Sequence, residues 1–443
     1  MASRYSTATT ALAFLIACNH ATVDDSVDPG VTPPDTEIGT NPDPGSNPDP
    51  GTGSGGDPGT GPGAPAATCV LGSDGFATAV GMVRAAQLND LAIDSAGNAL
   101  FATKGDDGQL DGLTKLSASG EVLFTRPFGS VVATDRNGNA YIAGSFTQPI
   151  DLGLGVMTPE GNIDAFVAKL NIRGEIEFAR PLRLCGDGVQ SIAVDATGRL
   201  AVSGTAMGTA LLSPEGEVQA VIAVAGDVAF NSHGDLIIAG TFTTTIDLGD
   251  GPITPGAAGS EGFVATFDST GQRLWSHVIT GAGVHVTSVA VDSKDAIVLV
   301  GYYEATIDLF GEQFRAQVAG EAGRVTGAFV AKLDASGELI WKDGTAAGVE
   351  RNGVAVDASD NVFSAGAEAG NTGFFRIPLM TSTNAMGERG PSALSSQLFT
   401  GSPNGRGQSV AVDSCGSVYM TFNLLDSPNP TSPLRAYVVK FKQ

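Results

Sequence analysis

Short apolar segments that flank a polar turn recur along most of the chain. In residues 288–301, Val289 to Val291 lead into a polar tetrapeptide that begins at Asp292, and Ile297 to Val300 follow as a second apolar segment. An aspartate that opens such a turn accepts a hydrogen bond from the backbone two residues on, which favours a tight turn. The pattern therefore predicts a β-hairpin.

This hairpin occurs seven times, and its turn-opening residues lie 36 to 65 residues apart. Each repeat thus has room for four strands and their loops. The turn-opening residues are Asp94, Asp135, Asp195, Asn231, Asp292, Asp357 and Asp413. Because a polar residue recurs at the same place in every repeat, we assign these residues a structural role in the turn.

A second hairpin lies downstream in most repeats. Its clearest copy is residues 328–341, where Phe-Val-Ala-Lys-Leu precedes an Asp-x-x-Gly turn, and residues 263–275 match it. Each repeat is therefore expected to be a four-stranded antiparallel meander, which is one propeller blade. The third repeat has lost most of its middle loop. The sixth lacks a clear second turn, so residues 381–391 are expected to be an inserted loop.

The last repeat is incomplete, since residues 436–441 match a third strand and no fourth strand follows. Residues 67–72 resemble the missing strand, and pairing them there would close the ring and remove both open sheet edges. The predicted fold class is all-β. We expect a seven-bladed β-propeller of four-stranded antiparallel blades over residues 67–443, with the last blade closed by an N-terminal strand.

Composition supports this architecture and excludes one class of partner. The 443 residues include 60 glycines, only 16% are charged, and the net charge is −23. Glycine is a poor helix former, so the composition argues against a helical protein. A chain this acidic repels phosphate backbones, and no nucleic-acid partner is expected.

The N-terminal residues read as a secretion signal. The apolar segment 11–17 is too short to span a bilayer and fits a signal-peptide core. Residues 15–18, Leu-Ile-Ala-Cys, resemble the lipobox of bacterial lipoproteins. The resemblance implies a signal peptide over 1–17, lipidation of Cys18 and a membrane partner through the lipid. The alternative is an ordinary signal peptide cleaved elsewhere, with Cys18 incidental.

The lipobox-like segment also predicts where the protein is located in the cell. Asn19 after the cysteine resembles the sorting pattern for outer-membrane delivery. The expected localisation is the cell envelope, lipid-anchored, at the outer membrane or cell surface. Residues 18–66 are rich in Pro, Gly and Asp and have almost no large apolar residues, so we expect a disordered tether.

The repeats resemble those of the bacterial seven-bladed β-propeller (SBBP) repeat family, many of whose members are surface or secreted lipoproteins. The matching pieces are the Val-Ala-Val-Asp hairpin, the Phe-Val-Ala-Lys-Leu hairpin with its terminal Trp, and the Ile-Asp-Leu-Gly loop starts at 150–153 and 246–249. The resemblance covers about residues 67–443 and implies the fold. It implies no catalytic residues.

No catalytic, cofactor-binding or metal residues are assigned from the sequence. The four histidines have no metal-ligand spacing, and neither a nucleophile elbow nor a phosphate-binding loop occurs. Three acids recur at matching loop positions, namely Asp151, Asp247 and Asp308. They could bind Ca²⁺, but repetition across blades favours a role in capping their own loops. We therefore expect no cofactor, with Ca²⁺ as the alternative.

Tryptophans and cysteines suggest contacts between segments that are distant in the sequence. Trp275 and Trp341 end two fourth strands and are expected to pack between neighbouring blades. Cys69 and Cys415 would both lie in the closing blade, which makes them the more attractive disulfide pair. The predicted strand spacing between them argues against the bond, so it remains one of two alternatives.

These features favour a non-enzymatic, monomeric, surface-tethered propeller that binds a protein or glycan partner or acts as an envelope scaffold. The middle loops 249–262 and 308–327 are the expected contact regions. One alternative is a periplasmic or extracellular propeller enzyme (lyase, glycan-cleaving or quinoprotein-like) with polar residues of several blades converging at the central channel. Another is an outer-membrane assembly factor of the propeller lipoprotein type.

Overall fold

The computed structural model describes ten stretches of the chain, all within the unit formed by residues 67–443. The expected signal peptide, Cys18, the tether, Cys69 and Cys185 lie outside them. Within these stretches no helix has the length and hydropathy needed to cross a bilayer. The described residues are 77–79, 86–105, 112–183, 188–257, 259–319, 324–345, 348–369, 376–394, 404–425 and 434–441.

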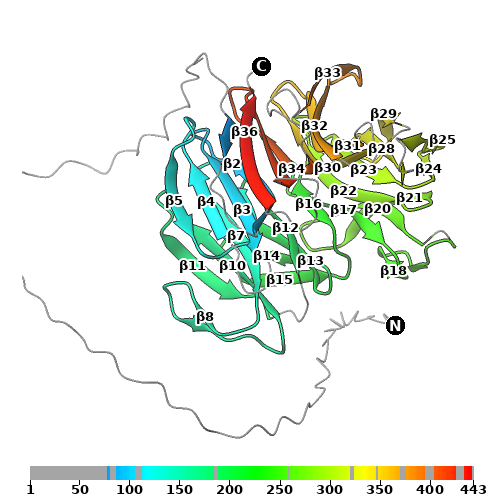
Figure 1. The fold of residues 1–443 in the computed structure, drawn as a ribbon. Coiled ribbons are helices and arrows are strands. Elements are labelled where there is room, and N and C mark those ends of the chain that lie inside the picture. Colours follow the sequence, from blue (N-terminus) through cyan, green and yellow to red (C-terminus); the bar gives the residue numbers. More distant parts are fainter. Residues whose placement is uncertain are drawn as a thin grey trace, which may run out of the picture. The chain divides into compact units, whose positions relative to one another are not determined.

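Seven four-stranded antiparallel blades make up the fold (Figure 1). Each innermost strand contacts the innermost strand of the next blade, and the seventh contacts the first, so the ring is closed. The predicted all-β, seven-bladed propeller is thereby confirmed.

The first three blades follow the chain from the inside of the ring outward. Blade 1 is β2(Ala86–Ile93), β3(Ala99–Gly105), β4(Gly112–Leu116), β5(Val122–Arg126). Blade 2 is β6(Val131–Thr134), β7(Ala140–Phe146), β10(Asp164–Leu170), β11(Ile176–Pro181). Blade 3 is β12(Val189–Val194), β13(Leu200–Gly204), β14(Gly208–Leu212), β15(Val218–Ile222).

The next three blades repeat this order. Blade 4 is β16(Asp227–Phe230), β17(Leu236–Phe242), β20(Glu261–Phe267), β21(Arg273–Gly281). Blade 5 is β22(His285–Val291), β23(Ile297–Tyr303), β28(Gly327–Leu333), β29(Leu339–Thr345). Blade 6 is β30(Val349–Val356), β31(Val362–Ala369), β32(Arg376–Thr383), β33(Arg389–Leu394).

Blade 7 closes the ring with strands from both ends of the propeller. It contains β34(Asn404–Val412), β35(Val418–Leu425) and β36(Leu434–Phe441), and its outermost strand is β1(Ala77–Ala79). Ala77 pairs with Val439 and Ala79 with Tyr437. The N-terminal closing strand was predicted correctly, but its position was not, because residues 77–79 rather than 67–72 pair with β36. Residues 67–72 lie outside the described residues.

The hairpin turns, two in each of the first six blades and one in blade 7, lie at one end of the ring, which we call the turn face. In the first hairpins the opening side chain accepts two backbone hydrogen bonds, as in Asp94, whose Oδ1 lies 2.9 Å from the nitrogens of Ala96 and Asn98. The same pair of bonds forms at Asp135, Asp195, Asn231, Asp292, Asp357 and Asp413. These bonds fix the turn locally.

Five of the first-hairpin turns have a glycine in the left-handed region, and blades 5 and 6 have an aspartate there instead. Asp295 has φ 62° and Asp360 has φ 63°. This region is unfavourable for a residue with a Cβ, although Asp tolerates it better than most. Each carboxylate binds the turn of the preceding blade: Asp295 accepts from Ser232 N–H and Asp360 from Ser293 N–H. These bonds between blades offset the backbone cost.

The sixth blade has a second hairpin after all, so the inserted loop expected at 381–391 is wrong. Asn384 Oδ1 accepts hydrogen bonds from Met386 N–H at 3.1 Å and Glu388 N–H at 2.9 Å. Asp268 and Asp334 form the equivalent bonds in blades 4 and 5. An amide oxygen accepts these bonds as a carboxylate does, so Asn-x-x-Gly replaces Asp-x-x-Gly.

Longer connections join the second and third strands at the opposite end, which we call the loop face. Blades 2 and 4 carry two-stranded hairpins here, β8(Ile150–Asp151) with β9(Val156–Met157) and β18(Ile246–Asp247) with β19(Pro252–Ile253). Blade 5 carries β24(Thr306–Leu309) with β25(Glu312–Arg315) and, further on, the short pair β26(Val318–Ala319) with β27(Arg324–Val325).

The hairpin β24–β25 is not a free loop. Strand β24 pairs with the outermost strand of blade 4, with Gly281 opposite Ile307, and extends that blade to six strands. Ile307 and Leu309 are fully buried. Part of the connection 308–327, which we expected to contact a partner, therefore covers a sheet edge.

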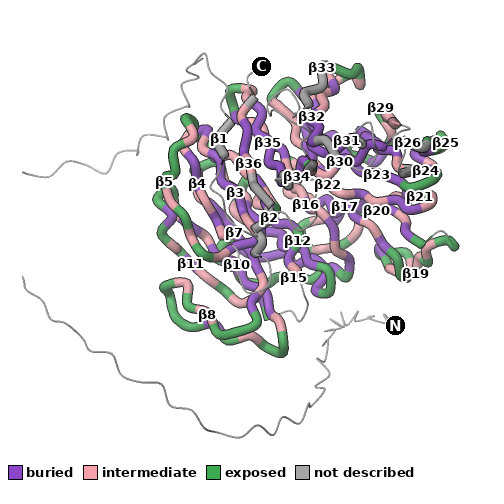
Figure 2. The backbone as a smooth tube through the Cα atoms, in the orientation of Figure 1, coloured by how far each residue is buried: buried purple, intermediate pink, exposed green. Residues whose placement is uncertain are grey.

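The core lies between the blades, and the burial colours follow the middle strands (Figure 2). At four junctions the aromatic residue of a fourth strand lies against the second-turn glycine of the next blade. A methyl group added at Gly387 would lie 2.9 Å from the indole of Trp341. The pairs are Phe124–Gly174, Phe178–Gly216, Trp275–Gly337 and Trp341–Gly387. The expected packing of Trp275 and Trp341 between blades is observed.

Candidate functional site

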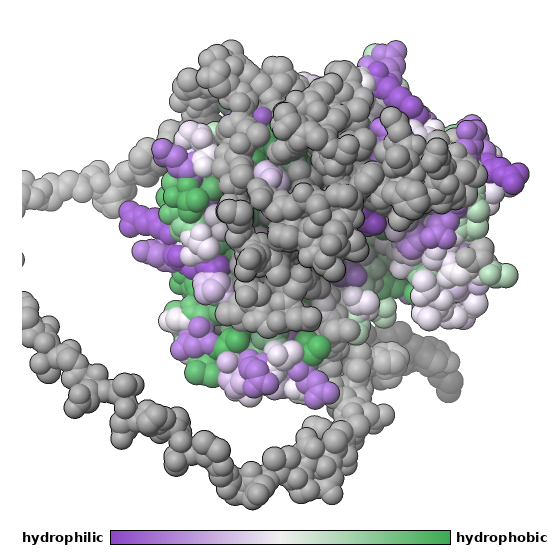
Figure 3. All heavy atoms as spheres, viewed as in Figure 1, coloured by the Kyte–Doolittle hydropathy of each residue, from purple (hydrophilic) through white to green (hydrophobic). Residues whose placement is uncertain are grey.

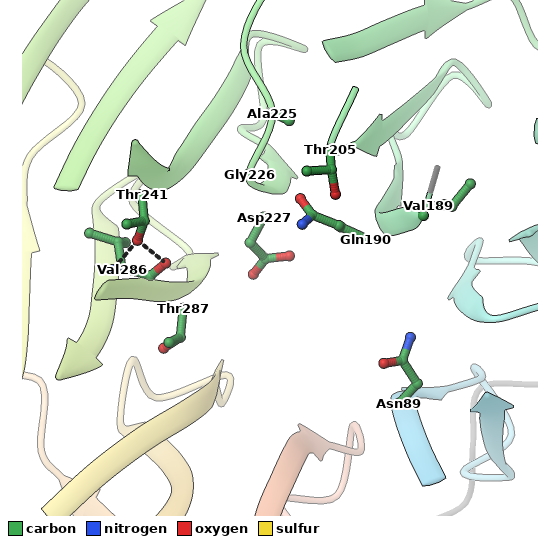
Figure 4. A pocket seen from close by; sticks show the side chains of 11 residues that line it. Asn89, Val189, Gln190, Thr205, Ala225, Gly226, Asp227, Thr241, Val286 and Thr287 are labelled. Carbon is green, nitrogen blue, oxygen red and sulfur yellow. Dashed lines mark hydrogen bonds between the residues drawn. The ribbon is translucent and has the colours of Figure 1, made fainter. Parts of the chain in front are cut away.

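The axis of the ring is hollow and polar. A cavity of about 440 Å³ opens among blades 1, 3, 4 and 5, and a second of about 360 Å³ continues along the innermost strands. Figure 4 shows Asn89, Gln190, Asp227 and Thr287 facing this space from four different blades. The channel is thus lined by amide, hydroxyl and carboxylate groups.

The local backbone explains why these side chains face the axis. In five blades the pairing between the first and second strands shifts register near the same position, which marks a β-bulge. A bulged residue is left out of the ladder and its side chain is redirected. The residues at this position are Asn89, Gln190, Thr287, Asn352 and Gln408.

In four blades the residue four positions before the turn clamps the neighbouring blade. Asp90 Oδ2 accepts a hydrogen bond from Val132 N–H at 2.9 Å. The same bond joins Ser191 to Val228 at 3.2 Å, Asp227 to Val289 at 2.8 Å and Ser288 to Val354 at 3.3 Å. Four of the seven blade junctions therefore share one side-chain-to-backbone bond around the channel.

Two of the clamping residues are carboxylates with raised pKa values. Burial raises the pKa of Asp90 to about 6, while hydrogen bonds from Val132 and Leu91 act in the opposite direction. Burial likewise raises the pKa of Asp227, although Ser191 and Ser288 donate to its two oxygens at 2.6 Å and 2.8 Å. Both acids retain some exposure to the channel, but the surrounding ring excludes most of the water that would solvate the charge.

The turn-opening acids lie apart from the channel, at the turn face, and two of them carry a deeply buried ion pair. Lys115 Nζ lies 2.8 Å from Asp94 and Lys332 Nζ lies 2.7 Å from Asp292, and all four side chains are at most 4% exposed. Lys440 lies 3.5 Å from Asp413. Each lysine is the next-to-last residue of a third strand, where the motif reads Lys-Leu in blades 1 and 5 and Lys-Phe in blade 7, so the repeat contains both halves of the pair.

The Ile-Asp-Leu acids cap their own loops. Asp151 Oδ1 accepts from Gly153 and Gly155, Asp247 Oδ1 from Gly249 and Gly251, and Asp308 Oδ1 from Gly311. In the part of the chain that the structure describes, no group of three or more His, Cys, Asp or Glu residues could hold a metal ion. The three acids belong to different loops and are not brought together.

Cys415 forms a disulfide bond. It is exposed and lies in the first-hairpin turn of blade 7. Its partner is outside the described residues, as are Cys18, Cys69 and Cys185, so the Cys69–Cys415 pairing stays a prediction.

Sequence reasoning missed both the clamps and the Asp–Lys pairs. A signal for the clamps was present, because the residue four positions before the turn is Asp or Ser in five repeats: Asp90, Ser191, Asp227, Ser288 and Ser409. Lys115 and Lys332 belong to the second-hairpin motif. Their pairing with Asp94 and Asp292 depends on strand register, which the motif does not give.

Comparison with known proteins gives structural likeness alone. No protein-family model and no curated protein matches the sequence. The chain is similar to BamB from Moraxella catarrhalis, with 12% identity over 80% of this chain and 85% of that chain and a TM-score of 0.39. It is similar to the WD40 repeats of RRP9, with 10% identity over 83% and 98% and a TM-score of 0.39.

A third likeness is to YCF48 bound to D1 peptide, with 9% identity over 83% of this chain and 97% of that chain and a TM-score of 0.45. Identities and TM-scores this low carry no argument about what this chain binds or does.

Proposed function

We propose that the chain is a non-enzymatic β-propeller, held at the cell envelope by a lipid on Cys18, that binds a protein or glycan partner through its loop face. The propeller fold fits a protein-binding or scaffold module. The finer proposal is supported by the lipobox-like residues 15–18 and by the contrast between the two faces of the ring.

The contrast between the faces is the observation that carries the proposal. On the turn face, the side chains that open the turns are used within the fold, in turn bonds, ion pairs and contacts between blades. The loop face carries the connections that differ from blade to blade, together with the polar mouth of the channel. Loops that vary on a regular scaffold are the usual place for recognition.

Blade 2 supplies exposed apolar residues on the loop face. Leu154 and Val156, on the β8–β9 hairpin, are 58% and 68% exposed. The space-filling view shows apolar patches among polar residues on the side of the molecule where β5 lies (Figure 3). Val122 and Leu123 of β5 are also exposed, but they directly follow the second turn of blade 1 and so belong to the turn-face end of that strand. Exposed apolar side chains on a projecting hairpin are suited to the core of a protein interface.

Crosslinking in intact cells tests the binding face. The variant Leu154→Asp with Val156→Asp should abolish the crosslinked complex seen with the unaltered chain. Ile172→Asp is the matched control, because Ile172 is also 58% exposed and lies in the same blade, but on the turn face. Equal crosslinking by all three proteins would overturn the assignment of the loop face.

The anchor is tested separately. Cys18→Ala should release the protein from the membrane fraction without changing its fold, because a lipid on this residue would supply the membrane affinity. A Cys18→Ala protein that stays membrane-bound would contradict lipidation and leave the binding-face test intact.

One observation favours a second candidate, a propeller enzyme with its site in the channel. Asp90 and Asp227 come from different blades, and a carboxyl group with a pKa near 6 is suited to proton transfer at neutral pH. Against this, the oxygens of both acids are used to clamp neighbouring blades. Turnover of a glycan or polyuronate that is lost in a folded Asp90→Asn variant would establish the enzyme.

A further inference from the structure

Blade 6 departs from the repeat at two positions that are apolar or glycine in every other blade. Six residues before the turn it has Arg351, where the others have Leu88, Gly129, Val189, Ala225, Val286 and Gly407. Seven residues after the turn it has Ser364, where the others have Phe101, Ile142, Val202, Ile238, Leu299 and Met420. Opposite Ser364 in the sheet lies Thr381, where blade 5 has Ala331. A polar group has been built into what is otherwise core.

Arg351 is buried, and no acid in the described part of the chain forms an ion pair with it. It is 5% exposed, and its Nη1 donates to the hydroxyls of Ser364 and Thr381. Its Nε has no hydrogen-bond partner, and no carboxylate among the described residues forms an ion pair with it. Hydroxyl groups can satisfy N–H donors, but they cannot neutralise the charge, and an unpaired buried charge is costly.

The acid that acts on the pKa of Arg351 is already bound by another arginine. Asp343 raises the pKa of Arg351, but its carboxylate is held by Arg389, whose Nε lies 2.6 Å from Oδ2. Burial is the dominant influence and lowers the pKa of Arg351 to about 10, so the guanidinium is still charged at neutral pH. Among the residues that the structure describes, blade 6 therefore contains a buried cation that no carboxylate pairs with.

A cavity of about 200 Å³ lies beside this cation. Its walls combine the guanidinium with hydroxyl groups and two apolar side chains, Val349 and Leu379. Its polar lining is Arg351, Thr345, Thr381, Ser382, Thr383, Glu368 and Arg389. The space is large enough for a molecule of a few heavy atoms.

The lining also indicates the charge of the occupant. The planar guanidinium fork matches the two oxygens of a carboxylate. Glu368 on the wall and Asp343 nearby disfavour a doubly charged anion, while Val349 and Leu379 can cover a short aliphatic chain. We propose that the cavity beside Arg351 binds a small monocarboxylate, with the guanidinium as its main contact. This site does not depend on the proposed function.

Titration of the purified chain with sodium propionate, followed by calorimetry in buffers matched with NaCl for ionic strength, tests the site. The unaltered protein should show saturable binding. Arg351→Met should weaken binding at least tenfold, because the charged donors are lost. Arg180→Met is the matched control and should bind propionate as the unaltered chain does, since Arg180 is an exposed arginine of blade 2.

Arg351→Lys is a second variant, needed in case the methionine variant does not fold. It keeps the positive charge and most of the aliphatic part of the side chain. It should fold and still bind propionate several-fold more weakly, since the fork is lost. Absence of saturable propionate binding, equal binding by Arg351→Lys and the unaltered protein, or tighter binding of phosphate than of propionate would each overturn the proposal.

Discussion

Blades 5 and 6 are neighbours with the same strand order, and they treat a buried charge in opposite ways. In blade 5, Lys332 lies in the core but forms an ion pair with Asp292 of its own turn. In blade 6 the register places Ser382 where blade 5 has Lys332, and the buried cation is instead Arg351 at the other end of the sheet. In blade 5 the repeat supplies the partner of its buried charge, whereas in blade 6 no described carboxylate pairs with the buried cation.

The largest expected effect is on the paired charge. Lys332→Met would leave the Asp292 side chain, which is 1% exposed, without its cation partner. Breaking a buried pair by removing one partner costs about 3–5 kcal/mol. Urea denaturation followed by tryptophan fluorescence measures the loss.

Lys169→Met is the control for that experiment. Lys169 pairs with Glu177, and both side chains are partly exposed at 22% and 43%. Exposed pairs contribute less than about 1 kcal/mol. If both variants lost the same free energy of unfolding, burial of the Lys332–Asp292 pair would not increase its contribution to stability.

The junction between the two blades gives the next largest effect. Asp360→Ala removes the 2.6 Å contact with Lys294 and the bond from Ser293 N–H. The expected loss is about 1–3 kcal/mol, the range for a hydrogen bond to a charged group. Asp360→Gly should lose less, because glycine relieves the left-handed backbone at φ 63°.

This junction also has a defined pH dependence. The hydrogen bond from Lys294 is the main cause that lowers the pKa of Asp360 from 3.8 to about 2. The stabilisation is therefore complete above the unfolded pKa and is lost as the pH falls through about 2. The difference between the unaltered protein and Asp360→Ala should disappear in acid, and a constant difference would contradict the ionic origin.

A smaller effect is expected from Asp90, an unpaired acid at the channel. Its pKa is raised from 3.8 to about 6, so the folded state binds its proton more tightly than the unfolded state does. Its contribution to stability is complete below the unfolded pKa and is lost as the pH rises through about 6. Stability should fall by about 1 kcal/mol between pH 5 and 7.

Asp90→Asn isolates this contribution. The asparagine cannot ionise, so the slope between pH 5 and 7 should be shallower than in the unaltered protein when denaturation midpoints are compared. Parallel slopes would mean that Asp90 does not titrate in this window.

The smallest change in stability is expected at Arg351. Replacing a buried ion by an apolar residue of similar volume is often neutral or stabilising, so Arg351→Met should lie within about 1 kcal/mol of the unaltered protein or above it. A loss comparable to that of Lys332→Met would show that Arg351 has a structural partner and would remove the contrast between the blades.

The turns could be predicted from the sequence because their chemistry is local. Asp292 accepts hydrogen bonds from backbone groups two and four residues on, so a short segment of the sequence contains both the acceptor and its donors. Asn384 was missed because the pattern was read as requiring aspartate, whereas the turn requires a side-chain oxygen. The closing strand was misplaced because Ala77–Ala79 carries no pattern of its own and is selected by its pairing with β36.

The candidate sites were less predictable because their partners are distant in sequence. Asp227 receives hydrogen bonds from Ser191 and Ser288, which belong to the blades on either side. Arg351 stands out when the repeats are aligned, but only the packing shows that nothing neutralises it. The repeated sequence pattern therefore predicts the fold. A residue that departs from the pattern can be interpreted only when its contacts in the structure are known.

The closure of blade 7 brings together segments from the two ends of the propeller. Strand β1 can pair only with β36, which lies far along the sequence, so the ring cannot close until nearly the whole propeller is available. Contacts between such distant segments slow folding because a very long loop must be ordered first. Until then the outer edge of β36 is an unpaired template for other strands. Pairing with β1 therefore protects this edge from other chains as well as completing the blade.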